Sequence, residues 1–517
     1  MRRTTLWLMA VAVLIATPSA VRAFCGFYVS GADSDLYNNA TMVLMLRDGT
    51  KTVLSMQNNY QGPPENFAMI VPVPVVLQEE NVKTLDPEVF KRIDQLAAPR
   101  LVEYWEEDPC MKERYLEEGM MARPSAMRSK GQYAMKKSDL GVTIEAQFKV
   151  GEYEIVILSA KDSSGLDKWL KLEGYNIPDN SEPLLRPYVE SGSKFFVAKV
   201  DVTKVKFDGD QVMLSPLRFH YDTKTFSLPV RLGLVNSAGT QDLIVHILAK
   251  GDRYEVANYD NVTIPTNIDV DDTTRNEFGA FYAALYDSTL EKNKGAVITE
   301  YSWDASTCDP CPVPGLTGQE LATLGGDVLP GAAHPGEFVL TRLHARYSKD
   351  SLGEDLVFKT AKPIAGGREW RTGPEGQLEK GSVDSHANMF QARYAIRHEW
   401  TGAVECKDPI RGRWGGPPAG LKRDASPRAA MDLAFAPRGT VELPKLVKQD
   451  IPEIGLVHTA VAAPTVASKK AAGGEQKQQA KQGKGGCGCR AGGDAPGGAV
   501  LALLVLVALR RRCERSR

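Results

Sequence analysis

The sequence predicts an α+β fold with a mainly antiparallel β-sheet body and a few short helices. Two observations support this prediction. Segments in which apolar and polar residues alternate, as in a half-buried strand, outnumber segments with the period of a helix. The strand-like segments also occur in runs with only occasional helices between them, a pattern typical of α+β proteins.

The alternating segments are the expected strands. In residues 225–235 the apolar residues share one face, and Pro229 on the other face predicts an edge strand, because proline cannot donate a ladder hydrogen bond. The expected strands cover residues 195–207, 214–221, 225–235, 242–249 and 337–347.

Helix signals are fewer. Asp86-Pro87 provides an N-cap and a first-turn proline before apolar residues at helical spacing over 89–96. Asp272 precedes a second such pattern over 278–285, and a third short helix is expected around 166–170.

The N-terminus predicts export. Arg2 and Arg3 precede an apolar run over residues 6–16, and a small-residue pattern ends at Ala23. This order is typical of a secretory signal peptide, so we expect residues 1–23 to be removed by signal peptidase after Ala23. The run is too short for a permanent membrane span.

The C-terminus carries a second signal. Cys487 and Cys489 lie in a Gly-Cys-Gly-Cys run, followed by a short apolar segment over 499–509 and by three arginines at 510–512. This tail, residues 487–517, resembles the MYXO-CTERM class of sorting signals. The resemblance implies a sorting protease that acts near Cys487 or Cys489 and delivery to the cell surface. The arginines would stay in the cytoplasm by the positive-inside rule.

These ends imply a domain order and a compartment. We expect an exported body over 24–410, with one or two subdomains, and a Pro/Gly/Lys-rich linker over 411–486. A short C-terminal hydrophobic transmembrane helix in the tail would hold the body at the bacterial cell envelope. Processing of the tail would place the protein at the cell surface or outer membrane; without processing it would stay in the inner membrane, facing the periplasm.

Charge argues against one class of partner. The chain has 63 Lys+Arg and 64 Asp+Glu, a formal charge of -1, so it lacks the basic excess on which nucleic-acid binding depends. No nucleic-acid partner is expected. The partners that the two ends imply are signal peptidase, the sorting protease, a membrane, and either a surface polysaccharide or a surface protein.

Five cysteines lie in the expected body. In an oxidising compartment most of them should form disulfides, but an odd number leaves one over, and the spacing does not determine the pairing. Cys308 and Cys311 have the spacing of thiol-disulfide oxidoreductases, yet Pro312 and Pro314 disfavour the helix that would stabilise a thiolate, so a structural clamp is the favoured interpretation. The five are Cys25, Cys110, Cys308, Cys311 and Cys406.

The best candidate ligand site is a stripe on the expected strand 337–347. Arg342, His344 and Arg346 share one face, where they could receive a carboxylate or phosphate; the favoured alternative is the solvent-facing polar side of a half-buried strand. Arg218, His220 and Asp222 form a similar stripe, and the two would join if their strands paired.

Motifs typical of catalysis are absent from the sequence. No nucleophile elbow, P-loop, dinucleotide fingerprint or metal-binding histidine pair is present, so we expect no cofactor, no metal and no identifiable catalytic residue. Enzymatic activity stays open, with a non-enzymatic protein favoured.

Several spans of the body resemble a known family. They include Phe24 to Tyr28, Phe67 to Pro74, Leu185 to Val189, Pro216 to Tyr221, Cys308 to Cys311 and Leu340 to Tyr347. Together they are similar to the bacterial domain of unknown function 2330, over residues 24 to about 410. The resemblance implies an extracytoplasmic, often membrane-tethered protein, and it brings no activity or site residue.

These observations lead to one functional hypothesis and two alternatives. We expect an exported, membrane-tethered or surface-sorted binding or structural module that is not an enzyme. The alternatives are an extracytoplasmic enzyme, either a thiol oxidoreductase at Cys308 and Cys311 or a hydrolase, and a module that binds anions or carbohydrates.

Overall fold

The computed structural model describes residues 27–29, 40–57, 68–110, 141–173, 177, 181–201, 203–208, 211–236, 239–369, 378–379, 381–431, 433 and 438–457. All of them lie in the first of two units, Met1–Thr459; the second is Ala460–Arg517. The predicted signal peptide, the Ala23 cleavage site, Cys25 and the tail with Cys487 and Cys489 lie outside the described residues.

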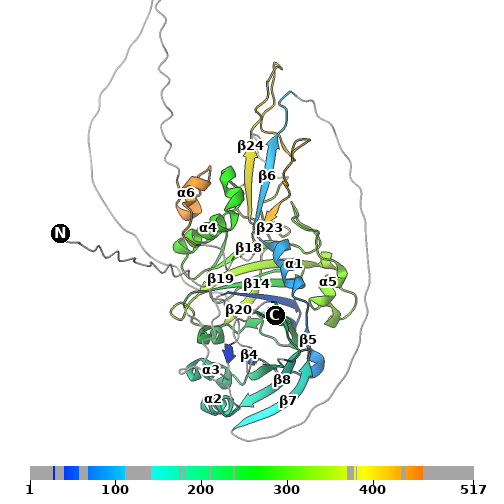
Figure 1. Cartoon of the computed structure of the whole chain (residues 1–517), viewed down its shortest axis with the longest axis vertical. Coiled ribbons are helices and arrows are strands. Elements are labelled where there is room, and N and C mark those ends of the chain that lie inside the picture. The colour runs from blue at the N-terminus through cyan, green and yellow to red at the C-terminus, as the bar shows by residue number, and fades with distance from the viewer. Residues whose placement is uncertain are drawn as a thin grey trace, which may run out of the picture. The chain divides into compact units, whose positions relative to one another are not determined.

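An 11-stranded main sheet runs through the described unit (Figure 1). Its order is β22-β21-β23-β18-β19-β14-β2-β3-β12-β5, and β16 pairs with β18. Most neighbours are antiparallel, whereas β14 with β2, β16 with β18 and β21 with β23 are parallel. The strands are β2 Ala40–Asp48, β3 Lys51–Met56, β5 Val82–Thr84, β12 Leu217–Asp222, β14 Gln241–Lys250, β16 Asn261–Thr263, β18 Val297–Asp304, β19 Phe338–Tyr347, β21 Ile364–Gly366, β22 Val383–Asp384 and β23 Met389–Gln391.

A second, antiparallel sheet packs against one face of the main sheet. Alternation along β2 decides the faces: Val43 and Met45 join the core between the two sheets, while Leu44 and Leu46 point to the other side. Helices α2 and α3 cover the outer face of the second sheet. This sheet has the order β1 Phe27–Val29, β4 Ala68–Val73, β9 Lys194–Val200, β8 Tyr153–Ala160 and β7 Val142–Val150.

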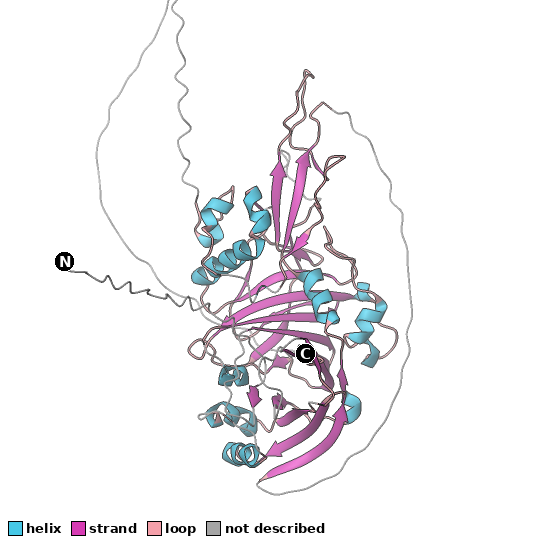
Figure 2. Cartoon of the chain, in the orientation of Figure 1, coloured by secondary structure: helices cyan, strands magenta, loops and turns pink. Residues whose placement is uncertain are grey.

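The other face of the main sheet is covered by α1, α4 and α5 (Figure 2). Apolar residues at helical spacing explain the contact, since Phe90, Ile93 and Leu96 of α1 are buried. The helices are α1 Glu88–Ala97, α2 Ser163–Leu172, α3 Glu182–Glu190, α4 Phe278–Lys292, α5 Gly318–Thr323 and α6 Leu443–Leu446. The predicted α+β fold is therefore confirmed.

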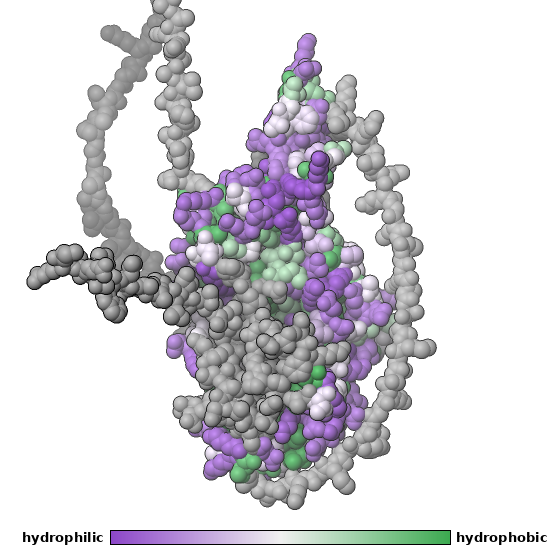
Figure 3. All heavy atoms as spheres, viewed as in Figure 1, coloured by the Kyte–Doolittle hydropathy of each residue, from purple (hydrophilic) through white to green (hydrophobic). Residues whose placement is uncertain are grey.

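A third, five-stranded sheet forms the β6–β24 end of the unit. The disulfide Cys110–Cys406 joins the segments that follow its two longest strands. Figure 3 shows mainly hydrophilic side chains around this end, with smaller hydrophobic areas between them. The strands are β17 Ile268–Asp269, β24 Arg393–His398, β6 Arg100–Glu106, β25 Trp414–Gly415 and β26 Arg428–Ala429.

The remaining described strands form two smaller sheets. One has the order β13 Ser227–Leu228, β20 Leu356–Ala361 and β15 Arg253–Val256, and the other pairs β10 Lys206–Asp208 with β11 Gln211–Met213.

Three local expectations need correction. The predicted strand 225–235 is only β13 followed by the 3-10 helix η2, Arg231–Asn236, because Pro229 cannot continue a ladder. Asp271, not Asp272, caps the element before α4, and this element is the 3-10 helix η3, Asp272–Asn276. The helix α3, which contains Pro187, was not expected from the periodicity.

The predicted start of the linker at residue 411 is wrong. Residues beyond it pair with β6 through β25 and β26, and α6 and the 3-10 helix η7, Pro452–Ile454, pack against α4. Gly- and Pro-rich composition concealed sparse apolar anchors, which are Leu433, Leu443, Leu446, Ile451 and Ile454. The folded body therefore continues to at least residue 457.

Across the described parts of the chain, we find no helix that is both long and apolar enough to cross a bilayer. The predicted transmembrane segment of the tail is outside those parts and stays a prediction.

Candidate functional site

The predicted ligand stripe lies in the interior. Arg342, His344 and Arg346 do share one face of β19, but Arg342 and His344 are 0% and 1% exposed. Tyr286 of α4 covers this face, and its ring stacks on His344 with the centroids 4.0 Å apart. Both interpretations of the stripe assumed contact with solvent, and that assumption is wrong for Arg342 and His344, whereas Arg346 is partly buried.

A β-bulge places a carboxylate between the first two stripe residues. The register of β18 against β19 shifts between Thr299 and Tyr301, which leaves Glu300 as the extra residue. Its carboxylate accepts hydrogen bonds from Arg342 Nε at 2.6 Å and from His344 Nδ1 at 2.8 Å. Burial alone would raise the pKa of Glu300, but the two cations outweigh it and lower this pKa to about 2.

His344 is held as an imidazolium. Its second ring nitrogen, Nε2, lies 3.0 Å from Asp242 Oδ1, so both nitrogens face carboxylates and both must donate. Burial works against the charged ring, yet Glu300 and Asp242 prevail and raise the pKa of His344.

The remaining charges of the network also pair. Arg342 Nη1 binds Asp94 of α1, and Arg346 and Arg438 each bind both Asp242 and Asp287. Four cations, with His344 among them, thus face four carboxylates, with Glu300 among them. Such a network is neutral and orders the packing of α1 and α4 on the sheet, and it offers no excess charge to an anionic ligand.

The second stripe is not adjacent to the first. β12 carries Arg218 and His220, and three strands separate it from β19. Arg218 is buried and donates to the carbonyl oxygens of Ala322 and Thr323 and to Asp327, so it fixes the end of α5. The joint polar surface that strand pairing would have produced is therefore ruled out.

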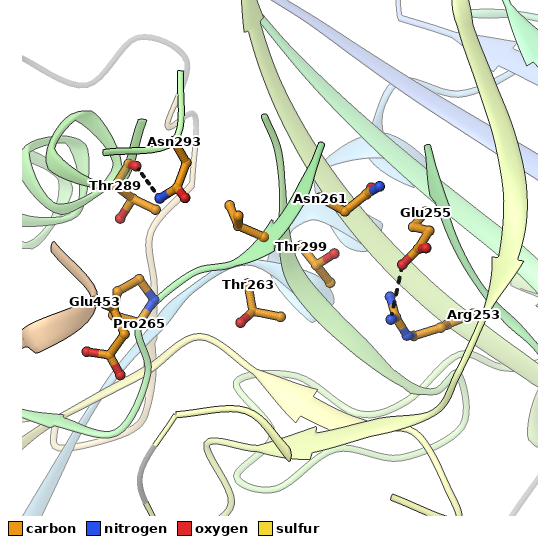
Figure 4. Close-up of a pocket in the computed structure, with 10 residues that line it drawn as sticks. Arg253, Glu255, Asn261, Thr263, Pro265, Thr289, Asn293, Thr299 and Glu453 are labelled. Carbon is orange, nitrogen blue, oxygen red and sulfur yellow. Dashed lines mark hydrogen bonds and ion pairs between the residues drawn. The ribbon is translucent and has the colours of Figure 1, made fainter. Parts of the chain in front are cut away.

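A cavity of about 400 Å³ lies instead beside α4 (Figure 4). Its walls come from β15, β16, α4, β18 and η7, segments up to 200 positions apart in the chain. No sequence motif marks them, and only the fold brings them together. The lining residues are Arg253, Glu255, Asn261, Val262, Thr263, Pro265, Thr289, Asn293, Thr299 and Glu453.

The cavity combines one ion pair with neutral polar groups. Arg253 Nη2 lies 3.3 Å from Glu255, and Arg253 Nε donates to the carbonyl oxygen of Lys362. Burial lowers the pKa of Arg253, while Glu255 opposes this effect. At the other end Asn293 Nδ2 donates to Thr289 O at 2.9 Å, as Figure 4 shows.

Two groups in the lining have hydrogen-bonding capacity left. Among the described residues, no group donates a hydrogen bond to the Asn293 amide oxygen or to the Glu453 carboxylate. Asn261, by contrast, uses its whole amide on the backbone of Val256 and Tyr259. The cavity can thus supply an acceptor amide, a carboxylate and threonine hydroxyls to a ligand.

Four of the five expected disulfide cysteines are paired. The bridges are Cys110–Cys406, with 296 positions between the partners, and Cys308–Cys311. In the ranges that the structure describes, no group of three or more His, Cys, Asp or Glu side chains could hold a metal ion.

A known bacterial family matches the chain. The model of a family described as an uncharacterized protein conserved in bacteria, DUF2330, matches residues 19–359. The chain belongs to the DUF2330 family. In this DUF2330 protein the match includes most of the main sheet and the buried network on β19 except Arg438, whereas β24, α6 and η7 follow it in the sequence. No curated protein and no solved structure matched the chain.

Proposed function

We propose that this DUF2330 protein is an exported, envelope-tethered binding module, and that the cavity beside α4 binds a small, hydroxyl-rich ligand such as a saccharide. The cavity carries the proposal. Its volume of about 400 Å³ falls in the usual range of ligand sites, and polar groups with free capacity line it.

The lining favours a neutral ligand. Arg253 pairs with Glu255, and Lys359 also pairs with Glu255 at 3.3 Å. These two cations balance the carboxylates of Glu255 and Glu453, so the side chains sum to no net charge. A guanidinium donor next to a carboxylate acceptor can bind neighbouring hydroxyls of a sugar, which need both kinds of partner. None of the ten described lining residues is aromatic, so hydrogen bonds rather than ring stacking would hold the ligand.

The lining also supports binding more than catalysis. Covalent catalysis needs a nucleophile next to a base that a third group orients. The hydroxyls of Thr263 and Thr289 bond instead to Ser382 and to the carbonyl oxygen of Leu285. Neither contact would activate a hydroxyl.

Three features support export and tethering. The N-terminal pattern that ends at Ala23 is typical of a signal peptide, and the tail at Cys487 and Cys489 resembles a sorting signal. A bridge between Cys110 and Cys406 suits an oxidising compartment, where disulfides persist. Signal peptidase, a sorting protease and a surface polysaccharide are the partners that this location implies.

Ligand binding is tested by thermal denaturation of the exported protein with a panel of neutral monosaccharides, disaccharides and uronic acids. A sugar that binds only the folded state raises the melting temperature. We expect Glu453→Gln to weaken the affinity for that sugar about tenfold, the effect of one hydrogen bond to a charged group.

Glu291→Gln is the matched control, because it removes the same charge from an exposed position of α4. A panel in which no sugar raises the melting temperature would overturn the proposal. Equal weakening by the two variants would overturn the assignment to the cavity.

Tethering is tested by intact-mass analysis and cell fractionation of the native protein beside Cys487→Ala, Cys489→Ala and the double variant. We expect loss of the arginine tail, a mass addition that depends on one of the cysteines, and recovery at the cell surface. An intact tail in the inner membrane would contradict the sorting step.

A further inference from the structure

The Cys308–Cys311 bridge lies in a turn and has one exposed cysteine. Cys311 is exposed, whereas Cys308 is partly buried and packs against the apolar cluster beneath α1 and α5. A thiolate from solution can therefore approach the Cys311 sulfur, and the Cys308 sulfur would be the leaving group.

Other contacts hold the same turn. Arg100 Nη1 donates to Pro310 O at 2.8 Å, and the Gln391 amide donates to Asp309 O. Glu369 N also donates to the Asp309 carboxylate at 3.1 Å. Arg100 and Gln391 are both 0% exposed, so these anchors belong to the core and would remain after reduction.

The bridge also closes only a short loop, so it constrains the unfolded chain weakly. Its partners are three positions apart, and the loop-closure entropy that a disulfide removes from the unfolded chain is smallest for the shortest loops. The bridge therefore stabilises the fold less than the long-range bridge Cys110–Cys406 does.

Two arginines lie beside the turn, and one of them, Arg92, is also paired with Glu320 at 2.9 Å. Arg100 binds Pro310 O, and Arg92 of α1 binds the carbonyl oxygens of Pro314 and Gly315, so their contacts bracket Cys311. Arg92 Nη1 and Arg100 Nε are buried and have no hydrogen-bond partner. Nearby cations stabilise a thiolate, as a helix N-terminus does in other oxidoreductases. Asp309, Glu369 and Glu320 act in the opposite direction.

We propose that Cys308–Cys311 is an exchangeable disulfide that accepts two electrons from a dithiol of another exported protein. The donor's first thiolate attacks the Cys311 sulfur, an S–S bond to the donor forms, and the Cys308–Cys311 bond breaks with its electron pair left on Cys308. The donor's second thiolate then attacks the donor's first sulfur in the mixed disulfide. This forms the donor's own S–S bond and releases the Cys311 thiolate. The donor becomes a disulfide, its two protons go to the two cysteines, and this DUF2330 protein becomes a dithiol.

The test is reduction of the folded, full-length protein by dithiothreitol, followed by alkylation and peptide mass spectrometry. We expect Cys308 and Cys311 to be labelled at least tenfold faster than Cys110 and Cys406, with unchanged circular dichroism. Oxidised glutathione should add one glutathionyl group, at Cys311, to the Cys308→Ala variant, and one reduced glutathione is released in the exchange.

Arg92→Gln should slow the reduction about threefold, the effect of removing one partly exposed cation. Lys91→Gln is the matched control, since Lys91 is the next residue of α1, carries the same charge and is exposed. The proposal would be overturned if Cys308 and Cys311 were labelled only when the native circular dichroism is lost. Equal labelling rates for the two bridges would also overturn it. Equal rates in the two charge variants would overturn the role of Arg92.

Discussion

Replacement of Glu300 by Gln is the most direct test of the buried network. The variant keeps the shape of the side chain and removes its charge, so it leaves Arg342 and His344 without their shared carboxylate in a fully buried place. The Tyr282 hydroxyl, 2.5 Å from Glu300, loses a charged acceptor as well.

The magnitude follows from the pKa of Glu300. A fall from 4.5 to about 2 means that the fold favours the ionised carboxylate by about 3 kcal/mol. Breaking a buried ion pair by removal of one partner costs roughly 3–5 kcal/mol in other proteins, so the two arguments agree. We therefore expect Glu300→Gln to lower the free energy of unfolding by about 3 kcal/mol at neutral pH.

Urea unfolding of wild type and variant, followed by fluorescence and circular dichroism, measures this loss. Glu337→Gln is the control, because its carboxylate pairs with Lys250 at the surface, and we expect no measurable change there. The double variant Glu300→Gln/His344→Gln should lose less than the sum of the single losses, since the two residues are in contact. A loss below about 1 kcal/mol for Glu300→Gln would refute the reasoning.

The depressed pKa also sets a pH range. Glu300 contributes its stability above the unfolded pKa of about 4.5, and this contribution disappears as the pH falls through its folded pKa of about 2. The variant should therefore lose less stability than the wild type between these two values.

Three further predictions concern other parts of the body. His344 has a raised pKa, so its contribution to stability is complete below about pH 6.5 and is lost as the pH rises through its folded pKa. In that range the free energy of unfolding of His344→Gln should depend less on pH than that of the wild type. Cys110→Ser/Cys406→Ser should cost about 6 kcal/mol of unfolding free energy by the chain-entropy estimate, against about 2 kcal/mol for loss of the short bridge. Urea titration of both variants measures the two losses, and a larger loss for the short bridge would contradict the estimate. A chain that ends at residue 410 lacks the buried aliphatic anchors of residues 433–454, whose burial contributes roughly 10 kcal/mol to stability, so protease should digest it rapidly. A chain that ends at Thr459 should resist digestion, and equal resistance of the two chains would contradict the revised boundary.

Local signals in the sequence were sufficient for the fold class and for many elements. Alternation predicted the strands that became β9, β12, β14 and β19, and Asp86-Pro87 predicted α1. These signals depend only on neighbouring residues, because strand period, helix caps and proline geometry are properties of short segments. The same local reasoning was wrong at 225–235 and at the start of the linker, where buried residues in irregular segments obtain their stability from distant contacts.

The sequence by itself determined the α+β class, the family, and the residue pattern of the stripe on β19. Only the tertiary structure decided that α4 covers this stripe, that a bulge in β18 directs Glu300 between Arg342 and His344, and that residues from Arg253 to Glu453 enclose one cavity. The physical reason is that a polar residue on an alternating strand has the same sequence pattern whether water or a carboxylate satisfies it. Which of the two is present depends on helices and strands that are distant in the chain and adjacent only in the fold.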